Sequence, residues 1–499
     1  MIIAIIRSVN IKERRIFMEN IALLVEELIK MPDELSWVEF KHNNYDPKMI
    51  GEDISALANA ATLHEKNCAY MVWGIHDKTH EIVGTDHNLQ NIKKGNQELE
   101  GWLRGLLSEN ADFTFDETIV QDKRVCVLSI EPAISFPVRF EKIPYIRVGS
   151  YTKKLKDHPA LESKLWDKIK NTKFETQYAK TDLKLNEVLQ IIDYSYYFDL
   201  CKLSVPTDID GVAHYLLEEG IIVKQDNGLY SVTNLGAVLF AKNINIFSRI
   251  SRKALRIVQY EGSSRLLMKK ENIEQRGYVA GFEYFMKYID ALIPTEEIIT
   301  EAVRDKKSAY PSLAIREAVA NALIHQDLSV TGAGPVVEVF DNRIEITNPG
   351  KPLVDINRIV DNPPKSRNEK LASIMRRLGM CEELGTGWDR IVIECEIFQL
   401  PAPKIEIYED STKVTLYVEK SYTSMTPEDK LRACYLHACI KQVQGEQLTN
   451  GSLRDRFGLK DSSSGSISRL IKEAVEKNLI KPLDPDTAPR YMKYIPFWA

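Results

Sequence analysis

Apolar positions in the first 160 residues alternate between helical and strand spacing. Helical spacing, with apolar side chains every three to four positions, covers residues 20–30, 49–62 and 99–108. Short apolar or alternating runs, which predict strands, cover residues 34–41, 69–77, 81–86, 125–132 and 143–150. A turn around Lys78 to His80 separates the second and third of these runs. The pattern predicts one compact α+β domain, residues 20–160.

A second rhythm follows over residues 180–250. Helical patterns at 183–192 and 208–220 precede a hairpin pattern at 221–233, in which Asp226-Asn227-Gly228 forms the turn. Two helices followed by a two-stranded wing are typical of a winged helix. The alternative is a packing subdomain that contacts no nucleic acid. The second helix favours this alternative, because it carries several acidic and few basic residues (Asp208, Asp210, Glu218 and Glu219).

Beyond residue 250 the pattern predicts two further modules. A strand at 253–262 and a helix at 276–292 open the first module, residues 251–420. The second, residues 425–499, shows helices at 428–442, 451–457 and 465–478 and strands on both sides of 484–489. It has 12 Lys plus Arg against 9 Asp plus Glu, a net charge of 12 − 9 = +3. This excess favours a winged helix that contacts nucleic acid through Arg469 and Lys472, although such modules also serve in dimerisation.

Composition limits the class of protein. The 499 residues carry a net charge of −5, from 66 basic and 71 acidic groups, which excludes a chain-wide basic field for nucleic acid but not a local one. The length alone suggests about three domains. Seven cysteines without paired spacing fit a reduced, cytoplasmic protein. No apolar run approaches 18 residues, so we expect no membrane span. We expect residues 1–19 to be an arm or a mis-assigned start, with Met18 as the alternative initiator.

The strongest chemical signal lies within residues 314–387. Glu317 and Asn321 are four positions apart on a predicted helix, so both side chains emerge on one face. A carboxylate there could activate a water molecule for attack on a phosphate, and the amide oxygen could hold Mg²⁺. A strand ending in Asn348-Pro349-Gly350 follows. The later run Leu384-Gly385-Thr386-Gly387 opens a helix whose N-terminus could hold phosphate.

In this order these elements resemble the GHKL ATP-binding fold of gyrase-type topoisomerases, MutL and histidine kinases. They resemble more closely the divergent form in bacterial proteins labelled RecG-like. The resemblance implies Glu317 as general base, Asn321 as Mg²⁺ ligand, and Asn348 and Gly350 in the adenine pocket. It places Gly385, Thr386 and Gly387 at the phosphates. Asn348 stands where most such proteins have Asp, and no GxxxxGK[ST] motor motif occurs.

The N-terminal module resembles the AlbA-type core of the Schlafen family. The resemblance rests on ELSWVEFK, NAAT, VWGIHD and IPYIRVGSYT, although Asn67-Cys68-Ala69 replaces the usual Gly-Gly. It implies that Glu34, Glu39 and Asp77 hold Mg²⁺ or Mn²⁺ for phosphodiester cleavage. Phosphates would be steered by Lys41, Arg147 and Lys153. The alternative is that these charges only keep an edge strand soluble.

Together these features predict an α+β multidomain protein whose modules are an AlbA/Schlafen-like domain, a winged-helix connector, a GHKL-like sandwich and a C-terminal winged helix. The first hypothesis is an ATP-controlled endoribonuclease that acts on tRNA-like RNA in stress or antiphage defence and has slow ATPase activity. The rival is a non-enzymatic, ATP-sensing transcriptional regulator that binds DNA. A third option is an interaction scaffold. The GHKL resemblance also implies a homo-oligomer.

Overall fold

The computed structural model describes most of the chain and confirms a mixed α+β architecture. The described residues are 21–31, 35–66, 68–86, 92–134, 136–171, 173–225, 228–293, 295–299, 304–363, 365–381 and 387–499. They form two compact units. The first comprises Met1–Val188 with Ile209–Asn234, and the second comprises Leu189–Asp208 with Leu235–Ala499. Each unit is described by itself.

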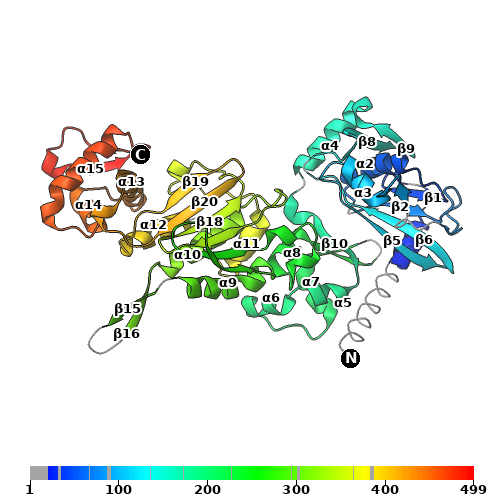
Figure 1. Ribbon diagram of the computed structural model, residues 1–499, viewed down its shortest axis with the longest axis horizontal. Helices are drawn as coiled ribbons and strands as arrows, with labels where there is room; N and C mark the ends of the chain where they lie inside the picture. The colour runs from blue at the N-terminus through cyan, green and yellow to red at the C-terminus, as the bar shows by residue number, and fades with distance from the viewer. Residues whose placement is uncertain are drawn as a thin grey trace. The chain divides into compact units, whose positions relative to one another are not determined.

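A four-stranded sheet is the centre of the first unit (Figure 1). Its strands, in spatial order, are β1 (Val38–Lys41), β2 (Ala69–Trp73), β6 (Lys123–Ile130) and β5 (Phe113–Val120). β1 and β2 run parallel, and the other neighbours are antiparallel. Successive side chains of β2 enter different cores. Met71 and Trp73 join the core that α2 helps to form, whereas Tyr70 and Val72 join the core that helical residues 21–28 help to form.

Helix α2 (Pro47–Leu63) fixes the rest of this unit to the sheet. Asp46 caps its N-terminus by accepting hydrogen bonds from the N–H groups of Lys48 and Met49. On its buried face, Asn59 donates to the carbonyl oxygens of Val138 (2.9 Å) and Tyr145 (2.8 Å). These bonds position the small sheet that carries Arg147. Its strands are β7 (Arg139–Phe140), β8 (Ile143–Val148) and β9 (Tyr151–Lys154).

The first unit contains further elements. They are the pair β3 (Lys93–Lys94) and β4 (Gln97–Glu98), helices α3 (Leu99–Leu106), α4 (Pro159–Asn171) and α7 (Ile209–Glu218), and a sheet of β10 (Tyr178–Leu183), β12 (Tyr230–Thr233) and β11 (Ile222–Lys224). Of these, α3 and α4 contribute buried side chains to the core beside α2. The predicted hairpin turn at Asp226 and Asn227 lies outside the described residues. α5 (Leu185–Ile191) lies at the boundary between the units.

Two strand predictions in the first unit need correction. Residues 81–86 form no strand, because only Ile82 pairs, in a single bridge with Ile75. β2 ends at Trp73 rather than continuing to Asp77, because Gly74 adopts a φ of +95° and the chain turns. β5, with few fully buried positions, was not predicted at all.

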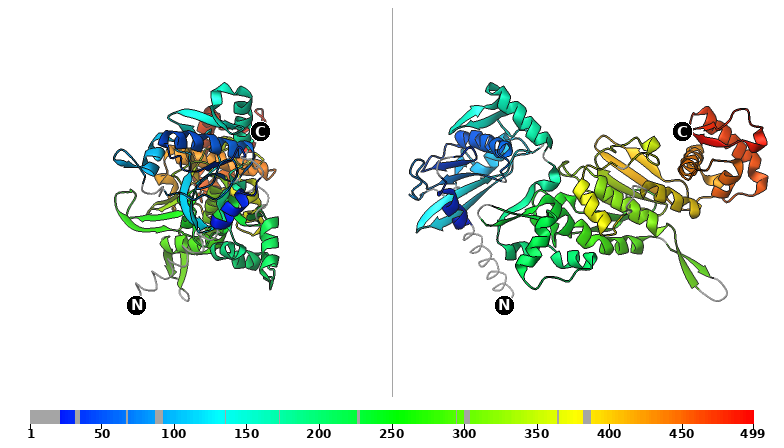
Figure 2. Two further views of the ribbon diagram at one scale, coloured as in Figure 1. Left: turned by 90° about the vertical axis from the view of Figure 1, so that its right-hand side faces the viewer. Right: turned by 180° about the vertical axis from the view of Figure 1, so that it is seen from behind.

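The second unit contains a six-stranded sheet in the order β14 (Met268–Ile273), β13 (Arg256–Tyr260), β17 (Val336–Val339), β18 (Arg343–Pro349), β20 (Ser411–Tyr417) and β19 (Lys404–Ile407). Its main helices are α9 (Tyr278–Leu292), α10 (Ser312–His325) and α12 (Gly387–Ile397). α10 packs against α12, α9 and β18. Figure 2 shows the chain from two further directions. The unit also contains α6 (Tyr194–Cys201), α8 (Asn234–Phe240), α11 (Glu369–Arg377) and the hairpin β15 (Thr295–Ile299) and β16 (Arg304–Ser308).

The C-terminal residues form a group of three helices and a hairpin, coloured orange to red in Figure 1. The elements are α13 (Pro427–Val443), α14 (Asn450–Arg456), α15 (Ser464–Glu476), β21 (Ile480–Pro482) and β22 (Tyr494–Pro496). Leu448 bridges to Tyr494 beside the hairpin. Helix bounds agree with the sequence prediction to within two residues, while the winged-helix assignments of both modules remain predictions.

Candidate functional site

Helix α10 presents the two side chains that the sequence singled out. Glu317 is buried, with 6% of its surface exposed, and Asn321 is half-buried one turn later. The first residue of α12, Gly387, lies directly on both of them. A Cβ atom at Gly387 would be 2.2 Å from Glu317 Oε1 and 3.1 Å from Asn321 Nδ2. The structure therefore brings together three of the predicted site residues from two helices 66 positions apart in the sequence.

The turn after β18 is bound to the end of α10. Gly350 has a φ of +95°, and a Cβ atom there would be 2.7 Å from the Cβ of Asp327. The N–H of Asp327 donates to the carbonyl oxygen of Pro349 (2.8 Å), and the N–H of Gly350 donates to that of Asp410 (2.7 Å). Asn348 is buried, and its Nδ2 donates to the Pro349 carbonyl (3.1 Å). The predicted adenine-pocket residues thus lie where β18 ends against the C-terminal end of α10.

The segment before α11 is bound to the same end of α10. Asn368 is buried, and its Nδ2 donates to the carbonyl oxygens of Ile324 (2.8 Å) and Gln326 (2.9 Å). Arg367 Nη2 donates to the carbonyl oxygen of Lys351 (2.6 Å), just beyond Gly350. Nothing in the hydrophobic pattern indicated these contacts, because they end on backbone carbonyls. Of the predicted phosphate-loop residues, Gly385 and Thr386 lie outside the described residues.

Asp389 is a buried acidic residue of α12 that was not singled out from the sequence. It lies in the first turn of α12, and only 9% of its surface is exposed. Burial, and then the negative charge of Asp361, raise the pKa of its carboxyl to about 6. Asp389 is two positions after Gly387, so its side chain emerges on a different face of α12 from the one that contacts Glu317.

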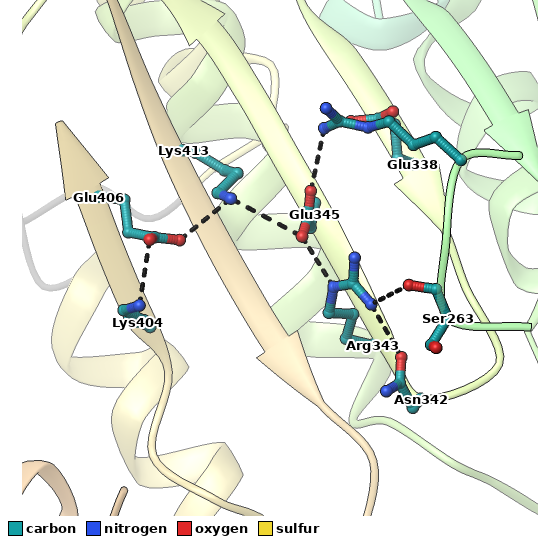
Figure 3. Close-up of polar contacts among 9 residues, drawn as sticks. Ser263, Glu338, Asn342, Arg343, Glu345, Lys404, Glu406 and Lys413 are labelled. Carbon is teal, nitrogen blue, oxygen red and sulfur yellow. Dashed lines mark hydrogen bonds and ion pairs between the residues drawn. The ribbon is translucent and has the colours of Figure 1, made fainter. Parts of the chain in front are cut away.

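The other face of the sheet is occupied by an ion-pair network (Figure 3). Glu338 and Glu345 lie directly opposite each other on β17 and β18, and both are buried. Arg265 Nη2 bridges them, at 2.6 Å from Glu338 Oε2 and 3.1 Å from Glu345 Oε2. Figure 3 shows Glu345 between Arg343 (2.7 Å) and Lys413 (3.7 Å). These contacts neutralise the carboxylates, which leaves the helical face as the candidate site.

In the N-terminal unit, Glu39 belongs to a buried cluster of mixed charge. Its Oε2 accepts from Arg147 Nη2 at 2.5 Å, and its Oε1 is paired with Lys41. Asp53 of α2, which sequence reasoning missed, lies 3.9 Å from Arg147 Nη1 and accepts from the Thr152 hydroxyl at 2.5 Å. Burial raises the pKa of the Asp53 carboxyl, and the Glu39 charge adds to this, while Thr152 and the two cations oppose it.

The predicted metal ligands are not assembled among the described residues. Asp77 lies in a turn with 60% of its side chain exposed, and its nearest ion-pair partner is His76 at 3.7 Å. Glu34 lies outside the described residues. Within the described ranges, no group of three or more His, Cys, Asp or Glu side chains is placed to hold a metal ion.

The basic residues predicted to contact nucleic acid differ in exposure. Arg147 has 2% of its side chain exposed and is committed to Glu39, so its role here is to position that carboxylate. Lys153 is exposed on β9, with its Nζ 5.5 Å from the ring centroid of Tyr151, which is 68% exposed. Arg469 and Lys472 are both exposed on α15.

Two parts of the chain match known protein families. Residues 34–156 match the family Schlafen, AlbA_2. Residues 332–416 match the family described as putative ATP-dependent DNA helicase recG C-terminal. Both resemblances drawn from the sequence are thereby confirmed. No curated protein matches the chain significantly.

Among solved structures, the crystal structure of the DIP2311 protein from Corynebacterium diphtheriae is similar to the chain. The sequence identity is 16%, the TM-score is 0.41, and the comparison covers 97% of each chain. Among the described residues, no helix is long and apolar enough to cross a membrane.

Proposed function

We propose that the chain is an ATP-binding protein that acts on nucleic acid. The observation that carries the nucleotide half is the contact of Gly387 with Glu317 and Asn321, because a side chain at position 387 would fill that space. The groups around it suit Mg·ATP. Asn321 offers an amide oxygen for Mg²⁺, Glu317 offers a general base, and the N-terminus of α12 favours phosphate. The match of residues 332–416 to a family described as ATP-dependent supports this.

Calorimetry with Mg·ATP tests the nucleotide site. We expect binding by the wild type, and loss of the Mg²⁺-dependent part of the affinity in Asn321→Ala. Glu317→Gln should retain binding but lower the rate of ATP hydrolysis by at least about a hundredfold, as for the loss of a general base. Glu428→Gln, an exposed change in the first turn of α13, is the matched control. If no adenine nucleotide shifts the thermal unfolding of the wild type, this half of the proposal fails.

For the nucleic-acid half, the support is the Schlafen, AlbA_2 match together with the largely exposed strand β9. Tyr151 offers an exposed ring on which a base can stack, and Lys153 offers a charge for a phosphate. Tyr151→Ala should weaken RNA binding by about 1–3 kcal/mol, the usual range for base stacking. A filter-binding titration would measure this, with Ile119→Ala, an equally exposed change on β5, as control. Equal losses in both variants would contradict the proposal.

Cleavage of RNA is the further step within this proposal. A divalent ion could use Glu39 only by displacing Arg147 and Lys41 from its oxygens. Asp77→Asn is the clean probe, because the side chain is exposed and supports no core. Mn²⁺- or Mg²⁺-dependent cleavage of tRNA that Asp77→Asn and Glu39→Gln abolish would establish nuclease activity. Intact tRNA after long incubation with Mn²⁺ would contradict nuclease activity, and the proposal would then be limited to RNA binding.

A second candidate function, a DNA-binding transcriptional regulator, is favoured by the exposed basic residues of α15. If that helix enters the major groove, Arg469→Ala and Lys472→Ala should each weaken duplex binding and lower the salt slope of the binding constant by about 1. Asp77→Asn should leave duplex binding unchanged.

We also propose a homo-oligomer, which light scattering with and without ATP would reveal.

A further inference from the structure

A pocket of about 210 Å³ shares Glu317 with the proposed nucleotide site, whereas its other lining residues have no role in that site. Three helical regions line it. Leu313, Arg316 and Glu317 come from α10, Arg376 comes from the end of α11 with Gly379, Met380 and Cys381 after it, and Arg390 comes from α12. Asn348 and Gly350 are not among the lining residues. The pocket therefore adjoins the proposed nucleotide site at Glu317 but includes none of the proposed adenine and Mg²⁺ residues.

The charge of the lining is basic. Three guanidinium groups face one carboxylate, Glu317, and the arginines come from three different helices. Arginine presents planar forks of N–H donors that match oxyanions in two-point hydrogen bonds. Arginines that line one pocket from three helices suit a group with oxygens on several sides, as in a phosphate, better than a planar carboxylate. Glu317 also lines the pocket, and its carboxylate together with the arginines makes the lining unsuitable for a purely apolar ligand.

Two of the three arginines are held in place by the fold. The Arg316 guanidinium is 3.2 Å from Glu283, donates to the carbonyl oxygen of Gly379 (3.2 Å) and lies over the ring of Phe282 at 4.7 Å. Arg376 Nε donates to the carbonyl oxygen of Ala372 one turn earlier (3.2 Å). Such contacts reduce the side-chain entropy that is lost when an anion binds.

Two features define the ligand. The volume is below the range of about 300–1,000 Å³ typical of pockets that enclose a drug-sized ligand, which favours a small group over a whole nucleotide. Arg390 follows Gly387 by three positions, so both lie on one face of α12 and the pocket adjoins the proposed phosphate end of the site. We propose that this pocket binds a phosphate group beside Glu317. The group is either the terminal phosphate of the bound nucleotide, which rests on the proposed function, or free inorganic phosphate, which does not.

Calorimetry on the full chain separates these sources, with inorganic phosphate and with Mg·ATP as probes. Arg376→Gln and Arg390→Gln should each lower the affinity for the ligand of the pocket about ten- to hundredfold, as expected for losing hydrogen bonds to a charged group. Arg490→Gln, an exposed arginine in the C-terminal loop, is the matched control. Circular dichroism should show that all three variants are folded. Arg316 is left unchanged, because its substitution would also remove the contacts to Glu283 and Phe282.

Each outcome decides the proposal. If inorganic phosphate competes with ATP, and the variants bind ATP more weakly but ADP as well as the wild type does, the pocket holds the terminal phosphate. If inorganic phosphate binds with the same affinity with and without saturating ATP, and the variants lose affinity only for phosphate, the pocket holds the free anion. Phosphate binding that the variants abolish in a chain that binds no nucleotide supports the pocket and removes the proposed function. Unchanged ATP affinity in both variants, with no phosphate binding by the wild type, overturns the pocket and leaves nucleotide binding intact.

Discussion

Gly387 is the residue through which α12 approaches α10, so its lack of a side chain is a steric requirement. A Cβ atom there would overlap Glu317 Oε1 at 2.2 Å, and Asn321 Nδ2 would be only 3.1 Å away. Neither helix can move far, because both pack through buried apolar side chains such as Ile391 and Leu323. The space above Glu317 and Asn321 therefore depends on one glycine.

We expect Gly387→Ala to lower the free energy of unfolding by about 1–3 kcal/mol, as for an overpacked core, and to abolish Mg·ATP binding. Gly465→Ala is the matched control, because nothing lies within 4 Å of a Cβ there. Gly465 is also near the start of a helix, so its substitution should be neutral or slightly stabilising. Urea unfolding and calorimetry would measure both quantities. A Gly387→Ala variant that binds ATP normally would contradict the steric argument.

Asp389 gives a prediction for the pH dependence of stability. Its carboxyl has a pKa of about 6 in the folded chain against an ordinary value of 3.8, so folding disfavours its ionised form. The destabilisation is absent below pH 3.8, grows as the pH rises, and is complete above about pH 6. At about 1.4 kcal/mol per pKa unit, it amounts to about 3 kcal/mol.

Asp389→Asn should therefore raise the free energy of unfolding by up to about 3 kcal/mol at pH 7.5 and hardly at all at pH 4. Urea unfolding across this pH range would show the difference. Asp486→Asn, in an exposed loop, should leave the curve unchanged. An equal gain from Asp389→Asn at both pH values would mean that the carboxyl does not titrate in this window.

Among the elements, helices were predicted more accurately than strands because of how they are buried. α9, α10, α13 and α15 bury one face or most of their length, so their apolar spacing is visible in the sequence. β14 has the sequence MKKENI and is exposed at almost every position, so it has no hydrophobic alternation to detect. The run at 81–86 has the opposite problem, since apolar Ile82 and Val83 suggested a strand that the chain does not pair beyond one bridge.

The candidate site residues divide in the same way. Glu317 and Asn321 could be found because their relation is local, four positions on one helix. The pairing of Glu39 with Arg147 could not, since Arg147 lies 108 residues away and its position depends on how β8 packs against α2. Asp53 and Asp389 were missed because neither stands in a recognisable motif, and only burial makes them unusual.

The ion-pair face of the six-stranded sheet gives a prediction at this scale. Glu338 and Glu345 are directly opposite each other, an arrangement that is destabilising unless a cation bridges the pair. Arg265→Ala should therefore lower the free energy of unfolding by more than the 0–1 kcal/mol typical of a surface ion pair. Arg256→Ala, which breaks the 2.6 Å pair with Glu271 on the edge strand, is the matched control. If Arg265→Ala and Arg256→Ala lowered the free energy of unfolding equally, Arg343 and Lys413 would be sufficient to neutralise the two glutamates.

At the scale of the second unit, α12 connects the proposed nucleotide site to the C-terminal helices. Gly387 begins the helix against α10, and Glu396 lies near its end, about 14 Å further along at 1.5 Å per residue. Glu396 Oε2 is 2.9 Å from His437 Nδ1 of α13, and its Oε1 is 3.6 Å from Arg456 Nε of α14. One carboxylate thus joins three helices at the junction with the C-terminal residues.

Removal of that carboxylate should weaken the junction strongly, because Arg456 has only 1% of its side chain exposed. Glu396→Ala would leave a buried cation without its partner, for which about 3–5 kcal/mol is typical. Glu473→Ala breaks the exposed pair with Lys477 on α15 and should cost at most about 1 kcal/mol in the same urea titration. The double variant Glu396→Leu with Arg456→Met removes both charges, so it should recover most of the loss. If Glu396→Ala were no more destabilising than Glu473→Ala, the junction would depend on apolar packing rather than on this ion pair. If the double variant recovered nothing, the loss would come from His437 instead, whose ring Nδ1 would have lost its carboxylate partner in both variants.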